Sequence, residues 1–248
     1  SGNYNITSCI SGSGETEGNN NFYAGNYAGQ CAGSGNDNTF IGRRAGYHTA
    51  YGSNNFFVGG CAGFCNTYGF YNNFLGYLAG YNNTTGFDNT FIGMKGGYNN
   101  TTGCNNTFIG YKAYGLAGTC SNTITLGNSS ITAIRAQVTS ITSLSDCRDK
   151  TDISSVPYGT NFLKKLRPVT FTWAMRDGGK VGQKETGFIA QELEEALNNS
   201  SLIKDWLDGL VISNEDRSRL EASPGKLLPL VIKAIQELDE RLSALENK

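Results

Sequence analysis

The chain has 248 residues, 38% of them hydrophobic and 17% charged, with a formal net charge of -1. This length allows one or two domains, and a charge near zero argues against a nucleic-acid-binding surface, which needs a basic patch. No run approaches the ~20 apolar residues of a membrane-spanning helix, and no signal peptide is visible. We therefore expect no nucleic-acid partner and no membrane insertion.

The two halves of the chain differ in composition. Before residue 145 the acids are Glu15, Glu17, Asp37 and Asp88, and the bases are Arg43, Arg44, Lys95, Lys112 and Arg135. All of the other charged residues lie in the last 104 residues, whereas 26 of the 33 glycines lie before residue 144. Two regions of different kind are therefore expected.

Seven cysteines form no Cys-x-x-Cys pair, and His48 is the lone histidine. Structural metal sites need several such ligands at defined spacings. We interpret the cysteines as small buried or half-buried thiols of a protein made in a reducing cytosol, and we predict no cofactor and no metal.

The first region repeats every 17 residues. One glycine recurs at positions 25, 42, 59, 76, 93, 110 and 127. An asparagine stands four residues before it, an aromatic residue two before it, an aliphatic residue directly before it, and alanine or glycine three after it, as in "NTFIGRRAG", "NFFVGGCAG" and "NNFLGYLAG". A second glycine column runs through 18, 35, 52, 69, 86 and 103. Seventeen residues is too short for a helix-hairpin repeat and suits one turn of a β-solenoid.

Each column has a physical interpretation. Adjacent side chains on a strand point to opposite faces, so either the aromatic or the aliphatic column lines the core, and a neighbouring copy of the chain is the natural cover for the other. The glycines mark corners with positive φ or close backbone approach. The asparagines bond to the backbone at a corner and to one another as a ladder. The alanines mark places with room only for a small side chain.

These features predict a mostly β repeat rod, either a homotrimeric β-solenoid or an intertwined triple β-helix, followed by a small α+β domain. We assign residues 1–17 to a lead-in, with truncation of a longer chain as an open alternative. Residues 18–127 are assigned to the shaft, 128–144 to an intertwined β stem and 145–248 to the tail domain. The shaft resembles the Asn-x-aliphatic-Gly repeats of trimeric adhesin heads and viral fibre shafts.

The shaft is a candidate for binding rather than catalysis. Tyr47, Tyr81 and Tyr98 share one column, which suits contact with a sugar or a protein or, alternatively, packing between rungs or subunits. A glycosidase needs two carboxyl groups about 5–9.5 Å apart. Asp37 and Asp88 share a phase but lie three rungs apart, about 14 Å at ladder spacing.

The last 104 residues predict a sequence of short elements and a long closing helix. "NFLKKLRPVTFTW" indicates a helix end and then a strand, and "RDGGK" a hairpin turn. "ETGFIAQELEEAL" enters a helix with apolar positions Ile189, Leu193 and Leu197. A closing helix over about 226–247 has a heptad seam made by Leu228, Val231, Ile235, Leu238, Leu242 and Leu245. That seam predicts a coiled coil with other copies, or else a helix packed on its own domain.

Four blocks in order, "SDCRDKTDI", "LRPVTFTW", "GFIAQELEEAL" and "LLPLVIKAIQEL", resemble the C-terminal intramolecular chaperone domain of phage tail spikes and fibres. The same self-cleaving module occurs in endosialidase tail spikes and in myelin regulatory factor. The resemblance implies a Ser/Lys dyad, here Ser145 and Lys150, that cuts the bond between Leu144 and Ser145. Asp146 and Arg148 complete the motif and are expected to hold the turn, and Gln191 and Glu192 are expected to add polar contacts.

The chemistry is consistent with the residues present. Serine is a weak nucleophile until a base takes its proton. His48 belongs to the rod, so no histidine serves the tail, and a lysine can be the base when burial lowers its pKa from about 10.4. If the dyad aligns only in the folded trimer, cleavage would report correct assembly.

We therefore expect a homotrimeric viral or phage tail fibre, assembled in the host cytoplasm and carried on the virion. It would attach to a host surface receptor, a glycan or a protein, after its tail acts as a single-turnover serine endopeptidase. The alternatives are a polysaccharide-degrading tail spike whose catalytic part is missing here, and a cellular surface protein that uses the same module.

Overall fold

The computed structural model describes residues 18–137, 141, 143, 145–214 and 217–247. The chain divides into two compact units with the boundary between Ile131 and Thr132. The predicted lead-in over residues 1–17 lies outside the described residues. Among the described helices, none is long and apolar enough to cross a membrane.

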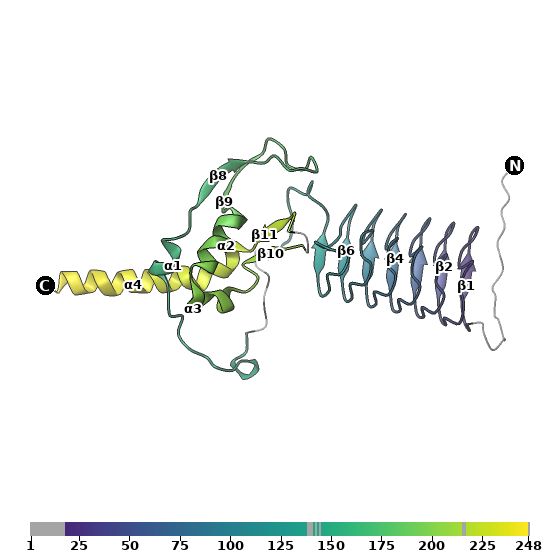
Figure 1. The fold of residues 1–248 in the computed structure, drawn as a ribbon, viewed down its shortest axis with the longest axis horizontal. Coiled ribbons are helices and arrows are strands. Elements are labelled where there is room, and N and C mark those ends of the chain that lie inside the picture. Colours follow the sequence, from purple (N-terminus) through teal and green to yellow (C-terminus); the bar gives the residue numbers. More distant parts are fainter. Residues whose placement is uncertain (1–17, 138–140, 142, 144, 215–216, 248) are drawn as a thin grey trace. The chain divides into compact units, whose positions relative to one another are not determined.

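The first unit is a β-solenoid, as the repeat predicts. Its seven strands are β1 (Phe22–Ala24), β2 (Thr39–Ile41), β3 (Phe56–Val58), β4 (Asn73–Leu75), β5 (Thr90–Ile92), β6 (Thr107–Ile109) and β7 (Ile124–Leu126). They form one parallel sheet in sequence order, stacked side by side (Figure 1). Each strand pairs with the strand 17 residues later, so that Phe40 faces Phe57 and Phe57 faces Phe74.

The aromatic column lines the core of the solenoid. Phe40, Phe57, Phe74 and Phe91 are fully buried, and consecutive rings stack with centroids 4.7–4.9 Å apart. The aliphatic column points the opposite way, and members such as Leu75 remain 42% exposed. The structure thus confirms that one column is internal and the other external, and cover by a neighbouring copy stays a prediction. Because each rung pairs within one chain, the solenoid alternative holds and the intertwined triple β-helix does not describe these strands.

The two glycine columns have the two predicted roles. Gly76 adopts a φ of +139°, and a Cβ there would lie 2.5 Å from the carbonyl oxygen of Gly93 on the next rung. Gly52 has no positive φ, but a Cβ would lie 2.3 Å from the carbonyl oxygen of Gly69. The first column therefore needs glycine for conformation and contact, and the second for contact alone.

The asparagine column forms a buried ladder. The side-chain amide of Asn72 donates to the Gly86 carbonyl at 2.8 Å and to Asn55 Oδ1 at 3.2 Å. Asn72 Oδ1 accepts from the backbone and side-chain N–H groups of Asn89, both at 3.1 Å. A second, shorter ladder through Asn66, Asn83 and Asn100 was not anticipated from the sequence.

The second unit is the small α+β domain expected. Its elements are η1 (Cys147–Asp149), α1 (Thr160–Leu163), β8 (Val169–Thr172), β9 (Lys184–Gly187), α2 (Ala190–Asn198), α3 (Ser201–Lys204), η2 (Asp205–Leu207), β10 (Val211–Ser213), β11 (Leu220–Ala222), η3 (Pro224–Leu227) and α4 (Leu228–Glu246). The pairs β8–β9 and β10–β11 are antiparallel. A core that includes Phe162, Leu197, Leu210 and Leu230 packs the helices together.

Helix α4 contacts its own domain and also presents an open seam. Leu230 and Ala234 are buried against the domain, and Glu237 accepts hydrogen bonds from the Gly159 and Thr160 backbone N–H groups and the Thr160 hydroxyl, which caps α1. Every residue of the heptad seam is exposed, from 39% to 67%: Leu228, Val231, Ile235, Leu238, Leu242 and Leu245. The C-terminal turns of α4 extend beyond the other elements of its unit (Figure 1).

The cysteines and the predicted stem differ in part from the sequence expectations. Cys31 and Cys147 are exposed, whereas Cys61 is buried, so the prediction of buried or half-buried thiols is wrong for the first two. Within the predicted stem, the described residues form no strand in the single chain, and Ile134 and Ile141 are 73% and 99% exposed. Val138 and Leu144 of that stem lie outside the described residues.

Candidate functional site

A single turn of 3-10 helix, η1, shapes the segment that the sequence motif singled out. Asp146 has an extended backbone and caps η1, because its carboxylate accepts the Arg148 backbone N–H at 2.9 Å. The Lys150 N–H then bonds to the Cys147 carbonyl and closes the turn. This reversal of the chain brings a residue five positions later back to Ser145.

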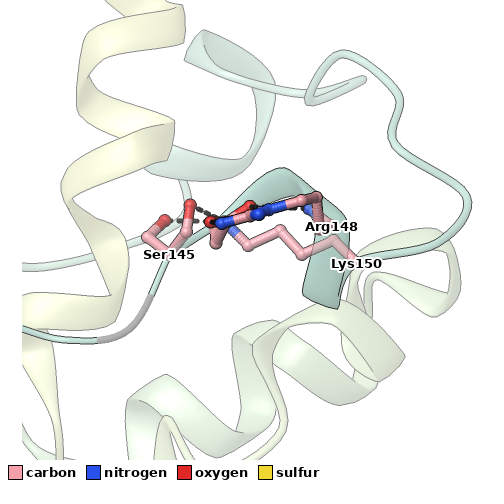
Figure 2. Close-up of polar contacts among 4 residues, drawn as sticks. Ser145, Arg148 and Lys150 are labelled. Atoms are coloured by element: carbon pink, nitrogen blue, oxygen red, sulfur yellow. Dashed lines mark hydrogen bonds and ion pairs between the residues drawn. The ribbon is translucent and has the colours of Figure 1, made fainter.

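Ser145 and Lys150 are in direct contact. Lys150 Nζ donates to Ser145 Oγ at 2.6 Å and to the Ser145 carbonyl oxygen at 3.1 Å, and Figure 2 shows the lysine side chain folded back toward the serine. The separation between Nζ and Oγ is within the range required for proton transfer between a base and a nucleophile. The structure therefore places the nucleophile and base named by the motif together.

Asp146 and Arg148 pair with each other beside this contact. Arg148 Nε donates to both carboxylate oxygens of Asp146 at 3.0 and 3.1 Å, and its terminal nitrogen adds a further bond (Figure 2). Hydrogen bonds from the Arg148 side chain, and then from its backbone N–H, lower the pKa of Asp146. The pair fixes the turn, and neither residue bonds to Ser145 among the described contacts.

Gln191 and Glu192 lie in the first turn of α2. Glu192 forms an ion pair with Arg167, and this hydrogen bond lowers the pKa of Glu192 and raises that of Arg167. Gln191 is exposed. Among the residues the structure describes, no hydrogen bond joins either residue to Ser145 or Lys150, so their supporting role stays a prediction.

The site is open to solvent in the single chain. Ser145 and Lys150 are both exposed, although burial is the usual means by which a lysine becomes a base. Leu144, the other side of the predicted scissile bond, lies outside the described residues. In the single chain, Ser145 and Lys150 are therefore in contact but are not buried.

The candidate residues of the shaft lie at equivalent positions of its rungs. Tyr47, Tyr81 and Tyr98 are half-buried and stack through Phe64 in one column, with centroids 5.0–5.4 Å apart, which is the predicted alternative of packing between rungs. Asp37 and Asp88 occupy equivalent corners at φ +55° and +54°, on rungs three repeats apart. Within the described part of the chain, no group of three or more His, Cys, Asp and Glu residues could hold a metal ion.

Comparison with known families places the site at the start of a recognised segment. Residues 145–202 match the model of the peptidase S74 family, described as the chaperone of endosialidase. The match begins at Ser145 and confirms the resemblance drawn from the sequence, while the shaft before it lies outside the matched range. No match was found among curated proteins or solved structures.

Proposed function

We propose that this chain is a trimeric fibre protein of a virus or phage whose tail domain acts as an intramolecular assembly chaperone and then releases itself. The observation that carries the proposal is the contact between Lys150 Nζ and Ser145 Oγ, at the first residue of the segment that matches the chaperone of endosialidase. The fibre would assemble in the host cytoplasm and attach the virion to a host surface.

The proposed cleavage is an acyl transfer within the backbone. Lys150 takes the hydroxyl proton of Ser145, and Oγ attacks the carbonyl carbon of Leu144. An ester forms between Leu144 and Ser145 Oγ, the amide bond breaks, and Lys150 passes the proton to the Ser145 nitrogen, which leaves as the new amino terminus. Water then hydrolyses the ester, which gives the Leu144 carboxylate and restores the serine hydroxyl.

Assembly is the proposed trigger. The dyad is already aligned in the single chain but exposed, so a neighbouring copy that covered Lys150 would supply the desolvation that a lysine base requires. The exposed heptad seam of α4 offers the means of bringing copies together. Cleavage would then report a trimer that has already formed, and removal of the tail would leave the fibre kinetically stable.

The shaft offers a matching surface for copies of itself. The outer side of its sheet carries the aliphatic column. Its members Leu75, Ile92 and Ile109 are 42%, 38% and 41% exposed. We assign this sheet face to contact between subunits, because a continuous apolar column on a soluble rod needs cover. The remaining faces would then meet the host receptor.

The test uses three single variants of the full chain and mass spectrometry of the freshly made protein. Ser145→Ala removes the nucleophile, and Lys150→Arg keeps the positive charge but cannot lose its proton. Both are expected to stay intact. Ser143→Ala, a serine two residues upstream, is the matched control and is expected to be cut like the parent chain. Cleavage of the Ser145→Ala chain at the same bond would rule out the proposed nucleophile.

A further inference from the structure

The basic side chains of the shaft gather at one corner of the solenoid. Within residues 18–131, all the arginines and lysines lie one or two positions after the repeat glycine: Arg43, Arg44, Lys95 and Lys112. We call these four residues the basic edge. Both acids of the same stretch, Asp37 and Asp88, lie five positions before that glycine at a different corner. The shaft therefore separates its charges around the rod axis.

The cations of the basic edge have no carboxylate partner within the described part of the chain. Among the described residues, none of the four forms a salt bridge or a side-chain hydrogen bond. In the other unit, by contrast, Arg148, Arg167, Arg217 and Arg219 each pair with a carboxylate. The described residues thus leave the positive charges of the basic edge without a paired carboxylate.

Tyrosine rings support these cations. Arg44 lies 5.8 Å from the Tyr27 ring centroid, Lys95 lies 5.6 Å from that of Tyr98, and Lys112 lies 5.2 Å from that of Tyr111. Such contacts orient a cation without neutralising it. Tyr27 and Tyr111 are also about half exposed, at 49% and 50%, so charge and aromatic surface lie together.

The backbone at this corner is left-handed throughout the repeat. Arg44, Lys95 and Lys112 have φ of 57°, 59° and 52°, and Cys61 and Leu78 at the same position of intervening rungs have φ of 56° and 58°. The conformation therefore belongs to the repeat geometry, and it holds the three basic side chains at equivalent positions of their rungs.

We infer that the basic edge binds an acidic polysaccharide, whose sugars carry carboxylate or sulfate groups. This inference rests on the proposed role in host attachment and names the chemistry of the receptor. The cations would meet the anionic groups, and the exposed rings of Tyr27 and Tyr111 would contact the apolar faces of the sugars. A polymer suits the edge because its cations are spread along the rod: Lys95 and Lys112 lie on adjacent rungs, and Arg44 lies three rungs from Lys95, about 14 Å at ladder spacing.

A nucleic acid is the less fitting polyanion. Single-stranded nucleic acids bind by stacking their bases on open aromatic faces. In the column beside the edge, ring faces already stack on one another, with Tyr81 and Tyr98 centroids only 5.4 Å apart, which leaves no gap for a base. The net charge of -1 over the whole chain also lacks the strongly basic balance of nucleic-acid-binding domains.

The experiment measures binding of the full-length protein to immobilised alginate and dextran sulfate, with neutral dextran and oligodeoxythymidylate as the other arms. We expect binding to at least one acidic polysaccharide, none to dextran, and weakening as salt rises from about 0.01 to about 1 M, where the Debye length falls from about 30 to about 3 Å. Lys95→Ala/Lys112→Ala should reduce the association constant about tenfold, the scale of two lost surface ion pairs.

Two control variants distinguish a local site from general charge. Lys95→Arg/Lys112→Arg keeps both cations and should bind within about twofold of the parent, whereas Asp37→Asn/Asp88→Asn raises the net charge at another corner and should change binding less than about threefold. Equal losses with the alanine and arginine pairs, no binding to either acidic polysaccharide, or preference for the oligonucleotide would each overturn the inference. A denaturing gel of the same samples shows cleavage separately, so the proposed autoproteolysis can stand when glycan binding fails.

Discussion

Replacement of Asn72 by alanine interrupts the buried asparagine ladder at the middle of the shaft. The change leaves the backbone N–H of Asn89 without its acceptor, since that group donates to Asn72 Oδ1. It also removes the bonds from the Asn72 side-chain amide to Asn55 Oδ1 and to the Gly86 carbonyl. Gly86 keeps a bond from Asn83, but Asn89 loses the acceptor of its backbone N–H and also the acceptor of one side-chain N–H.

These losses set the expected magnitude. The unpaired backbone N–H costs about 1–3 kcal/mol, and each of the three lost side-chain amide bonds about 0.5–1.5 kcal/mol. We therefore expect Asn72→Ala to lower the free energy of unfolding of the shaft by about 2.5–7.5 kcal/mol. Asn73→Ala is the matched control, because Asn73 is the exposed neighbour on β4, and its effect should stay within about 0.5 kcal/mol.

Urea unfolding can be followed separately in the two units. Both tryptophans, Trp173 and Trp206, belong to the second unit, so their fluorescence reports the tail while far-UV circular dichroism also reports the shaft. With a slope of about 2 kcal/mol/M in urea, the shaft midpoint should fall by about 1–4 M for Asn72→Ala. Equal midpoints for the Asn72 and Asn73 variants would refute the ladder as a source of stability.

Three further predictions concern the repeat glycine, the closing helix and its cap. Gly76→Ala should destabilise the shaft severely, because φ is +139° and the new Cβ would lie 2.5 Å from the next rung, whereas Gly178→Ala, at positive φ but with open space around it, should be milder by thermal melting. Leu238→Lys on the exposed seam should lower the oligomeric state in sedimentation without unfolding the tail, and a trimer that persists would argue against the seam as the contact. Hydrogen bonds from the Thr160 side chain and then its backbone lower the pKa of Glu237, so this stabilisation is present above the unfolded pKa of about 4.3 and is lost as pH falls through the lower folded value. The tail of a Glu237→Gln variant should therefore lose less stability than the parent on acidification through that window, and identical pH profiles would contradict the cap.

The solenoid could be predicted because the repeat carries its register. Strands that recur every 17 residues pair in register when stacked, so Phe40 meets Phe57 without further information. Which column faces inward could not be decided, since Phe40 and Ile41 are both apolar and alternate. The structure shows why the rings are inside: the Phe40 ring fills the space beside Gly46, where a Cβ would lie 2.4 Å from it.

The short ladder through Asn66, Asn83 and Asn100 was missed because it spans few rungs. Its signal was present as a column seven residues after the repeat glycine, where Thr49 precedes the three asparagines. The ladder ends at Ala117, which offers no amide, and the Asn100 side-chain oxygen is left buried without a partner among the described residues. The β10–β11 pair of the tail also escaped prediction, because strands of three residues, Val211–Ser213 and Leu220–Ala222, carry little periodicity.

The candidate site shows a different limit. Residues five apart share neither a helix face nor a strand face, so the spacing of Ser145 and Lys150 alone does not predict contact. The contact depends on the η1 turn, which Asp146 caps, and the family resemblance supplied what spacing could not. Burial of Lys150 was expected from the chemistry of a lysine base, but Ser145 and Lys150 are exposed in the single chain, and the proposed cover by other copies cannot be derived from one chain.

Mass spectrometry of the freshly purified parent chain, alongside Ser145→Ala, tests the central claim most directly. The account predicts that the parent yields two fragments, one that ends at Leu144 and one that begins at Ser145, and that Ser145→Ala yields the single uncut chain. A parent chain that assembles into trimers yet keeps its full mass, or a Ser145→Ala chain that is cut at the same bond, would contradict it.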